Sequence, residues 1–181
     1  MKFAILIPTL TERAKLLNRL IAEFDRQRKG KDVILIIHED QRQVTTGQKR
    51  NELIKAAIEN NVEYVAFFDD DDLPSANYID LNLKGIESKS DCNSLMGRIY
   101  FKGKPGNPFH HSIKYDHWYQ DDKMYYRNPN HLNCIKLELI KDIPFKDQTI
   151  GEDGHWSIDI QKAGVLKTEF AIDEIIYHYH K

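Results

Sequence analysis

Apolar and polar positions follow two repeating patterns along the first half of the chain. Continuous apolar runs of strand length occur at Phe3 to Ile7, Val33 to Ile37 and Tyr64 to Phe68, the last within a predicted strand from Val62 to Phe68. Between them, apolar residues recur at helical spacing, over Leu16 to Phe24 and over Leu53 to Ile58. Fully apolar strands separated by helices are typical of a parallel sheet covered on both faces. The pattern therefore predicts an α/β fold with a central, mostly parallel sheet and helices on both faces.

The second half of the chain has a less regular pattern. Apolar spacing predicts strands at Leu95 to Phe101 and Met124 to Arg127, with an irregular connection after the first because glycines and prolines punctuate residues 103 to 108. The other expected elements are a helix through Ile79, Leu83 and Ile86, a helix near Ile135 to Lys141, a helix from about Gly154 to Lys162 and a last strand through Ile175 to Tyr179. No repeat, low-complexity tract or linker divides the chain, so we expect one domain over residues 1–181.

Polar residues follow each of the three apolar strands of the first half. Thr9-Leu10-Thr11 follows the first strand, Glu39-Asp40 follows the second, and Asp69 to Asp72 follow the third. Ligands of open α/β sheets bind beyond the carboxyl ends of the strands. We therefore expect these three segments to converge on one crevice.

The four consecutive aspartates are the most unusual local feature. Like charges at this spacing repel one another unless a cation lies among them. On an extended backbone Asp69 and Asp71 point to the same side, and such an oxygen pair suits Mg²⁺ or Mn²⁺ better than zinc. The alternative is a solvated turn in which one aspartate caps a helix that begins at Ala76.

The net charge of the chain argues against one class of function, the binding of nucleic acid through a strongly basic surface. Among 181 residues, 28 Asp and Glu nearly balance 26 Lys and Arg, for a formal net charge of -2. The chain lacks the global basic field of proteins that hold nucleic acid by counterion release. Residues Arg98 to Lys136 nevertheless contain seven Lys or Arg, four His and eight aromatic residues, so a local basic and aromatic face stays open.

Cysteine and hydropathy patterns indicate the compartment. Cys92 and Cys134 have no CxxC spacing and are expected to be small buried hydrophobic residues in a reducing environment. The longest apolar run near the N-terminus stops at Pro8, too early for a signal sequence or a membrane span. We expect a soluble, cytoplasmic protein with no membrane span.

Several motifs together resemble a known family. Pro8-Thr9 with Arg13, a second strand ending at Asp40, the helix start Gly47-x-Lys49-Arg50-Asn51 and the run Phe68 to Asp72 are similar, in order, to the nucleotide-sugar half of family-2-type glycosyltransferases with the GT-A fold. The later Gly151-Glu152-Asp153 and His178-Tyr179-His180 resemble that family's acceptor-side acidic motif and its C-terminal metal histidine. The resemblance implies a nucleotide-sugar half over about residues 1–95 and an acceptor half over about residues 96–181.

The resemblance also implies roles for individual residues. The donor nucleotide would be bound by Pro8, Thr9, Arg13, Asp40, Lys49, Arg50, Asp69 and Asp70. Mn²⁺ or Mg²⁺ would be held at the diphosphate by Asp71 or Asp72, with His178 or His180 completing the metal shell. Each of these residues, taken alone, also fits a solvated loop, helix face or strand end.

Sugar transfer explains why such residue types are needed. Negative charge grows on the departing diphosphate, and a divalent cation and nearby Lys or Arg offset it. The acceptor hydroxyl loses a proton as it attacks, and a carboxylate on the other side of the sugar can take it. Asp153 is the expected base, with Glu152 beside it, and direct attack inverts the anomeric configuration. The alternative is that this pair caps the following helix.

The predicted function is therefore metal-dependent transfer of a sugar from a nucleoside-diphosphate sugar, most plausibly a UDP-sugar, to a glycan or lipopolysaccharide-type acceptor hydroxyl. Alternatives are transfer to hydroxylated bases in DNA, which is not favoured, and non-catalytic binding of carbohydrate or nucleic acid. A nucleotidyl- or phosphotransferase would need a Gly-rich phosphate loop, which is absent. Acceptor-side candidates are Gly97, Arg98, Trp118, His155 and Trp156, although aromatic residues often serve only the core.

Overall fold

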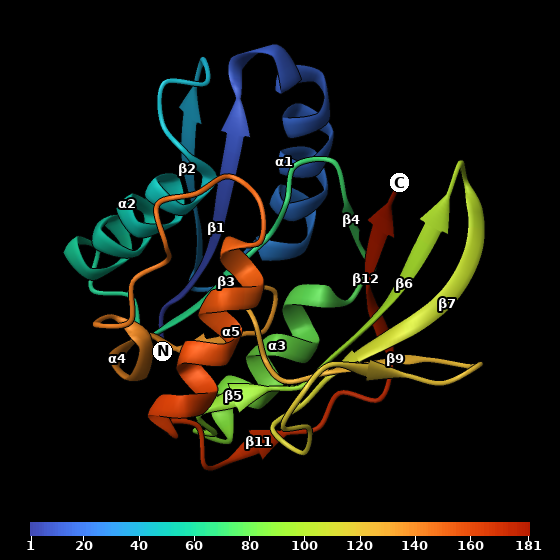
Figure 1. Cartoon of the computed structure of the whole chain (residues 1–181). Helices are drawn as coiled ribbons and strands as arrows, with labels where there is room; N and C mark the ends of the chain where they lie inside the picture. The colour runs from blue at the N-terminus through green and yellow to red at the C-terminus, as the bar shows by residue number, and fades with distance from the viewer.

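The structure is a computed structural model that describes residues 1–181 and contains two six-stranded sheets. The first sheet has the order β11-β5-β10-β3-β1-β2 (Figure 1). Its strands are β1 (Phe3–Leu10), β2 (Val33–Asp40), β3 (Tyr64–Phe67), β5 (Cys92–Asn93), β10 (Ile135–Lys136) and β11 (Glu169–Phe170). The three strands expected from the apolar runs of the first half are confirmed, and they form a parallel block, β2-β1-β3, in this sheet. The sheet as a whole is mixed, because β10 runs antiparallel to both β3 and β5.

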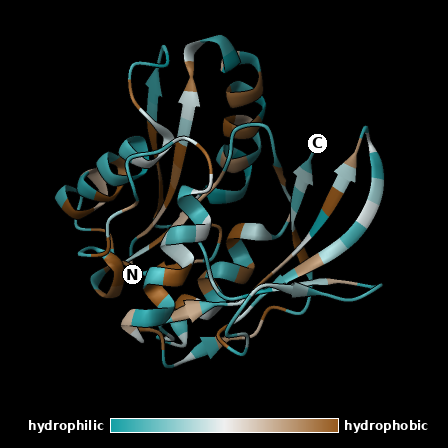
Figure 2. Cartoon of the chain, in the orientation of Figure 1, coloured by the Kyte–Doolittle hydropathy of each residue, from teal (hydrophilic) through white to brown (hydrophobic).

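Helices cover both faces of the first sheet, as the apolar spacing predicts. The helices are α1 (Ala14–Arg28), α2 (Thr46–Glu59), α3 (Tyr78–Glu87), α4 (Leu137–Ile140) and α5 (Glu152–Ala163), with a 3-10 turn η1 (Thr11–Arg13) before α1. Alternate residues of β1 pack to opposite sides: Ile5 lies in a core with α1 and α3, whereas Leu6 lies in a core with α2, α4 and α5. Figure 2 shows apolar and polar stripes alternating around the helices, as expected where one helix face is buried.

The second sheet packs against the core that contains α1 and α3. Its strand order is β4-β12-β6-β7-β9-β8. Its strands are β4 (Leu73–Pro74), β6 (Leu95–Phe101), β7 (Lys104–His111), β8 (Tyr119–Gln120), β9 (Tyr125–Arg127) and β12 (Ile175–His180). In Figure 1, β6 and β7 form a long curved hairpin beside β12 and the C-terminus. Gly97 of β6 packs under Phe109, since a Cβ at that glycine would lie 2.1 Å from the phenylalanine ring.

The prediction of an irregular connection after Phe101 is wrong in part, because residues 104–111 form the strand β7. Pro105 and Pro108 are tolerated there because β9 pairs only with residues Phe109 to His111 of β7, which leaves the proline-bearing half of the strand without a neighbour on that side. The helix expected near Ile135 to Lys141 is a short strand, β10, followed by α4.

Two expectations from composition can be compared with the structure. Both cysteines are free and buried, which confirms their assignment as core residues. No helix of the chain has both the length and the apolar character needed to cross a bilayer.

Candidate functional site

A cleft lies beyond the carboxyl ends of β1, β2 and β3, and we call it the strand-end cleft. Its volume is about 360 Å³, within the range of small-molecule sites. The structure brings most of the expected donor-binding residues together there: the lining includes Pro8, Thr9, Arg13, Lys49, Arg50, Asp69, Asp70 and Asp71. Asp40, at the end of β2, reaches the cleft through its ion pair with Lys49.

The four aspartates differ sharply in their exposure to the strand-end cleft. The side chains of Asp69 and Asp71 are 30% and 42% exposed, whereas Asp70 and Asp72 are fully buried. The expected extended backbone is wrong here: β3 ends at Phe67, and the Asp72 N–H donates to the Asp69 carbonyl at 3.2 Å, so the alternation arises from a turn. The carboxylates that a ligand can reach are therefore those of Asp69 and Asp71.

Asp72 binds the C-terminal strand, β12, through both of its carboxylate oxygens. It accepts hydrogen bonds from the Tyr177 hydroxyl at 2.6 Å and from the His180 backbone N–H at 2.7 Å. Burial raises the pKa of Asp72 to about 8, against the effect of these two donors, which favour the carboxylate. Asp72 is fully buried and does not line the strand-end cleft, so it does not face a metal bound there. No aspartate caps the next helix, which begins at Tyr78 without a side-chain cap.

Asp70 anchors the end of β1. It accepts a hydrogen bond from the Thr9 hydroxyl and pairs at 2.9 Å with Arg13 Nη1. The second amino group of Arg13 pairs with Asp71. Burial raises the pKa of Asp70, while the bonds to Thr9 and Arg13 oppose that rise. Arg13 thus supplies the cation that the acidic run requires and holds Asp71 beside the cleft.

Lys49 joins the ends of β1 and β2 through a nearly buried side chain. Its Nζ pairs with the Asp40 carboxylate and donates to the Thr9 carbonyl at 2.9 Å. Asp40 also accepts from the Val44 backbone N–H at 3.1 Å. Burial opposes ionisation of Asp40, but Lys49 and Val44 outweigh it and hold the pKa of Asp40 below its usual value. Asp40 therefore stays ionised at neutral pH.

Arg50 is buried and connects two distant acidic segments. Its Nη2 lies 3.0 Å from Asp69 Oδ1, and its Nε lies 3.2 Å from Glu152 Oε1. The guanidinium also stacks 5.1 Å from the Phe67 ring centroid. Partial burial would raise the pKa of Asp69, but Arg50 outweighs it and holds that pKa well below its usual range. Arg50 thereby fixes the start of α5 against the end of β3.

The other residues of the Gly47-x-Lys49-Arg50-Asn51 motif hold the segment that leads into α5. Asn51 exchanges two hydrogen bonds with the backbone of Phe145, at 2.9 and 2.8 Å. Gly47 donates its N–H to the Gln148 carbonyl, and a Cβ at this position would lie 1.9 Å from the Lys146 oxygen. Only glycine allows this close approach, which sets where α5 begins.

A second cleft, of about 340 Å³, lies at the start of α5, and we call it the α5 cleft. Asp153 lines it with a side chain that is 30% exposed, whereas Glu152 is buried against Arg50. The two clefts share part of their walls, formed by Arg50, Asp69, Thr149 and Tyr179. The carboxylates of Asp69 and Asp153 thus face one continuous space, while Glu152 serves to position Arg50.

Two residues of the α5 cleft, His131 and Arg127, were not among the sequence-based candidates. His131 is nearly buried, with Nε2 3.6 Å from Asp69 Oδ2 and Nδ1 3.9 Å from Asp153 Oδ2, and neither nitrogen has a hydrogen-bond partner. Arg127, at the end of β9, stacks 4.4 Å from the Trp118 ring centroid. Both lie in the basic and aromatic stretch from Arg98 to Lys136, but nothing in that stretch distinguishes them by sequence.

The C-terminal histidines lie on the other face of β12. His178 and His180 pack against the Tyr100 ring, with centroids 5.5 and 5.1 Å away. Tyr177 and Tyr179 alternate with them, so that Tyr177 reaches Asp72 and Tyr179 lines both clefts. Neither imidazole lines either cleft. His180 is the nearer of the two to Asp71, whose carboxylate partly offsets the lowering of the His180 pKa by burial, whereas no such effect of Asp71 reaches His178.

The acceptor-side candidates divide between core and surface. Trp156 is a core residue, 1% exposed and stacked on Phe145 at 4.3 Å, which contradicts its assignment as an acceptor contact. Arg98 does not line either cleft, because it pairs with His178 on the opposite face of the sheet. Trp118 and His155 are exposed and border a shallow groove beside the first turn of α5.

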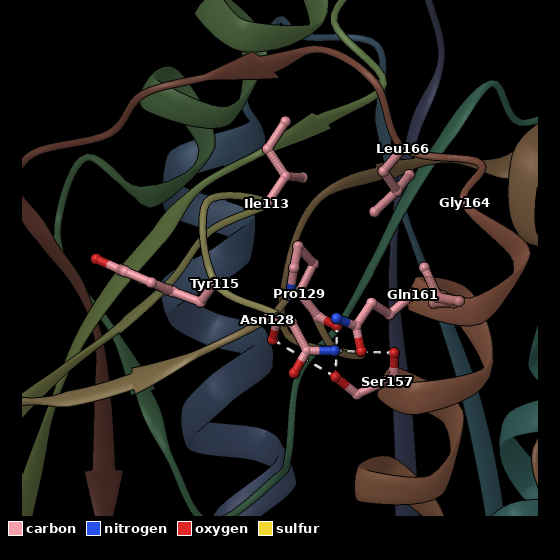
Figure 3. A pocket seen from close by; sticks show the side chains of 9 residues that line it. Ile113, Tyr115, Asn128, Pro129, Ser157, Gln161, Gly164 and Leu166 are labelled. Atoms are coloured by element: carbon pink, nitrogen blue, oxygen red, sulfur yellow. Dashed lines mark hydrogen bonds between the residues drawn. The ribbon is translucent and has the colours of Figure 1, made fainter. Parts of the chain in front are cut away.

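A smaller cavity, of about 80 Å³, lies beside the C-terminal half of α5, where Ser157 and Gln161 line it (Figure 3). Its polar groups already bond to one another: Asn128 Nδ2 donates to the Ser157 carbonyl at 3.0 Å, and Ser157 Oγ donates to the Pro129 carbonyl at 2.7 Å. These bonds tie α5 to the segment before β10. This cavity therefore serves packing.

The donor set for a divalent cation consists of the two open carboxylates. No three or more His, Cys, Asp or Glu side chains lie close enough together to hold a metal ion by themselves. Asp69 and Asp71 nonetheless fit a hard cation, since Mg²⁺ is usually held by one or two carboxylates, with waters and substrate phosphates completing its shell.

Comparison with solved structures identifies the fold. S. aureus TarS matches all of this chain at 16% identity and a TM-score of 0.68, and the chain spans 37% of TarS. TarS 1–349 in complex with UDP-GlcNAc gives a TM-score of 0.66 at 15% identity, with 59% of that chain covered. A Drosophila β1,4-galactosyltransferase 7 variant in complex with manganese, UDP-Gal and xylobiose matches 97% of this chain at 15% identity, with a TM-score of 0.57 and 66% of that chain covered.

Sequence comparison adds no assignment: no protein-family model matches the chain, and no curated protein matches it. TarS and the galactosyltransferase are GT-A-type nucleotide-sugar glycosyltransferases. The similarity extends over both sheets, since it covers the whole chain. The resemblance drawn from the motifs thus holds at the level of structure, and the chain has the GT-A fold of nucleotide-sugar glycosyltransferases.

Proposed function

We propose that the chain is a metal-dependent, inverting glycosyltransferase that moves a sugar from a UDP-sugar to an acceptor hydroxyl. The observation that carries the proposal is the pair of joined clefts, with Asp69 and Asp71 open to one and Asp153 open to the other. The GT-A fold and the UDP-GlcNAc and UDP complexes of TarS support UDP as the nucleotide.

The strand-end cleft has the chemistry to bind a nucleoside diphosphate. Asp40, ionised and fixed by Lys49, can accept an N–H from the base, while Asp69 can accept from the ribose hydroxyls. Arg13 and Lys49 put positive charge beside the diphosphate position. These fixed cations would offset the negative charge that grows on the departing diphosphate.

A divalent cation, Mn²⁺ or Mg²⁺, would be held by Asp71 next to the diphosphate. When bound, it would neutralise charge on the departing phosphate oxygens. The exposure of Asp71 and the manganese complex of the galactosyltransferase support this assignment. Asp69 lies two residues before Asp71 and can contribute a second oxygen or stay with the ribose.

In this proposal Asp153 acts as the general base. The bond from the sugar to the phosphate oxygen breaks, and its electron pair leaves with the nucleoside diphosphate. The acceptor oxygen forms the new bond to the sugar and gives its proton to Asp153. Asp153 lines the α5 cleft and not the strand-end cleft. This position supports attack on the sugar from the side opposite to the leaving diphosphate, and such an attack inverts the anomeric configuration.

The donor half of the proposal is tested by thermal shift and calorimetry with UDP, with and without Mn²⁺. We expect UDP to raise the melting temperature and Mn²⁺ to increase the shift, since a ligand of the folded state stabilises it. Asp71→Asn should lose the Mn²⁺-dependent part, whereas Asp142→Asn, at an exposed residue outside both clefts, should keep it. Absence of any UDP binding would contradict the proposal.

The base assignment is tested with UDP-sugar turnover. Asp153→Asn should bind UDP as the unmodified chain does and lose transfer, because asparagine cannot take the proton. Full transfer by this variant would overturn the assignment. The xylobiose complex of the galactosyltransferase supports a glycan hydroxyl as the acceptor.

A further inference from the structure

Arg127 differs from every other arginine that lines the two clefts. Arg13, Arg42 and Arg50 each pair with carboxylates. The guanidinium of Arg127 forms neither an ion pair nor a hydrogen bond with any other residue, although the side chain is half-buried. A partly desolvated cation without a partner is costly, so the position calls for a ligand that supplies one.

The side chain is held in place by apolar packing. Arg127 ends β9, where it is paired in register with His111 of β7. Its guanidinium lies over the Trp118 ring, and that ring packs across the first turn of α5, 3.6 Å from where a Cβ of Gly154 would lie. Two elements of the fold therefore position Arg127 without using any of its five N–H groups.

Two cations of the α5 cleft, Arg127 and Lys181, form no ion pair with a carboxylate. Burial lowers the pKa of Arg127, and the nearby Asp153 carboxylate partly offsets that effect. Lys181 also lines the cleft, with its ammonium near the Tyr179 ring and no carboxylate partner. A guanidinium fork matches the oxygens of a phosphate or carboxylate in two parallel bonds, which a neutral sugar hydroxyl cannot offer.

We propose that Arg127 binds an oxyanion carried by the acceptor, so that the acceptor is an anionic molecule such as the phosphate ester of a polyol or sugar. The anionic group would lie on Arg127 while a neighbouring hydroxyl faces Asp153. That the anion belongs to the acceptor rests on the proposed function, whereas the anion site itself rests on the position of Arg127 over Trp118.

The two tryptophans give a direct readout in the full chain by ¹⁵N NMR. The Trp118 indole lies against Arg127, whereas the Trp156 indole is buried and donates to the Ile143 carbonyl at 2.8 Å. With UDP saturating the strand-end cleft, glycerol 3-phosphate should shift the Trp118 signal and leave the Trp156 signal unchanged. Glycerol should shift neither, and glycerate tests whether a carboxylate suffices.

Variants separate a specific anion site from general charge attraction. Arg127→Met should weaken glycerol 3-phosphate binding roughly tenfold or more, since a charge-assisted hydrogen bond contributes about 1.5–3 kcal/mol. Arg127→Lys should fall between this variant and the unmodified chain, and Arg26→Met, at a surface ion pair, should bind normally. An unchanged Trp156 signal reports that each variant is folded.

Either of two results would overturn the inference: no response of Trp118 to any anion, or equal affinity in Arg127→Met. These outcomes are distinct from failure of the proposed function, which is reported by the UDP titration itself. If UDP does not bind, the glycerol 3-phosphate titration is run without it and still decides whether Arg127 holds an anion.

Discussion

Arg50 is the residue whose replacement tests most directly how the site is held together. Arg50→Met keeps an unbranched apolar side chain beside Phe67 but removes the guanidinium and its charge. Asp69, 3.0 Å away, and Glu152, 3.2 Å away, then lose their shared partner. The two acidic segments that Arg50 joins are 83 residues apart in the sequence, from 69 to 152.

The expected cost follows from the burial of the two carboxylates. Removing one partner of a buried ion pair costs about 3–5 kcal/mol, because the other charge stays buried without compensation. Asp69 is 30% exposed and can regain water, whereas Glu152 is nearly buried and cannot. We therefore expect the lower end of that range, about 3 kcal/mol, most of it due to Glu152.

The assay is urea unfolding at pH 7, monitored by tryptophan fluorescence. Arg26→Met is the matched control, since its pair with Glu23 is exposed and its loss should be far smaller. The double variant Arg50→Met with Glu152→Gln should recover about 1–2 kcal/mol relative to Arg50→Met, because the stranded charge is gone. The reasoning is refuted if Arg50→Met costs no more than Arg26→Met, or if the second substitution recovers nothing.

Two further predictions concern the segments on either side of the strand-end cleft. Gly47→Ala should destabilise the chain by about 1–3 kcal/mol and weaken UDP binding, because its Cβ would lie 1.9 Å from the Lys146 oxygen. Gly154→Ala, whose Cβ meets nothing closer than 3.6 Å, is the control and should unfold at an unchanged or higher urea concentration. Asp40→Asn should lower stability at pH 7 by removing the partner of Lys49. Since folding lowers the pKa of Asp40, its contribution is present above about pH 4 and is lost as the pH falls through the folded-state pKa, so the unfolding midpoints of the two proteins should converge in acid; a constant gap down to pH 2 would contradict this.

The sequence by itself determined the parallel half of the fold and the place of the strand-end cleft. The runs Phe3 to Ile7 and Val33 to Ile37 are apolar at every position, which is typical of parallel strands. The first is fully buried in β1, whereas the second lies in the edge strand β2, in which Ile37 is exposed. The polar residues that follow parallel strands lie at one edge of the sheet. The sequence alone therefore predicts that Thr9, Asp40 and Asp69 lie close together. These inferences needed only local patterns and the geometry of parallel strands.

Only the tertiary structure decided which charges are open to a ligand. Asp70 and Asp72 are fully buried, and Asp72 is bound by Tyr177, 105 residues away, so no local pattern separates it from Asp71. The same holds for Arg127, whose lack of a partner depends on what α5 and β9 bring near it. The sequence gives the charge of each side chain, but the burial and pairing of that charge depend on contacts between distant segments. Burial and pairing determine whether the charge stabilises the fold or can bind a ligand.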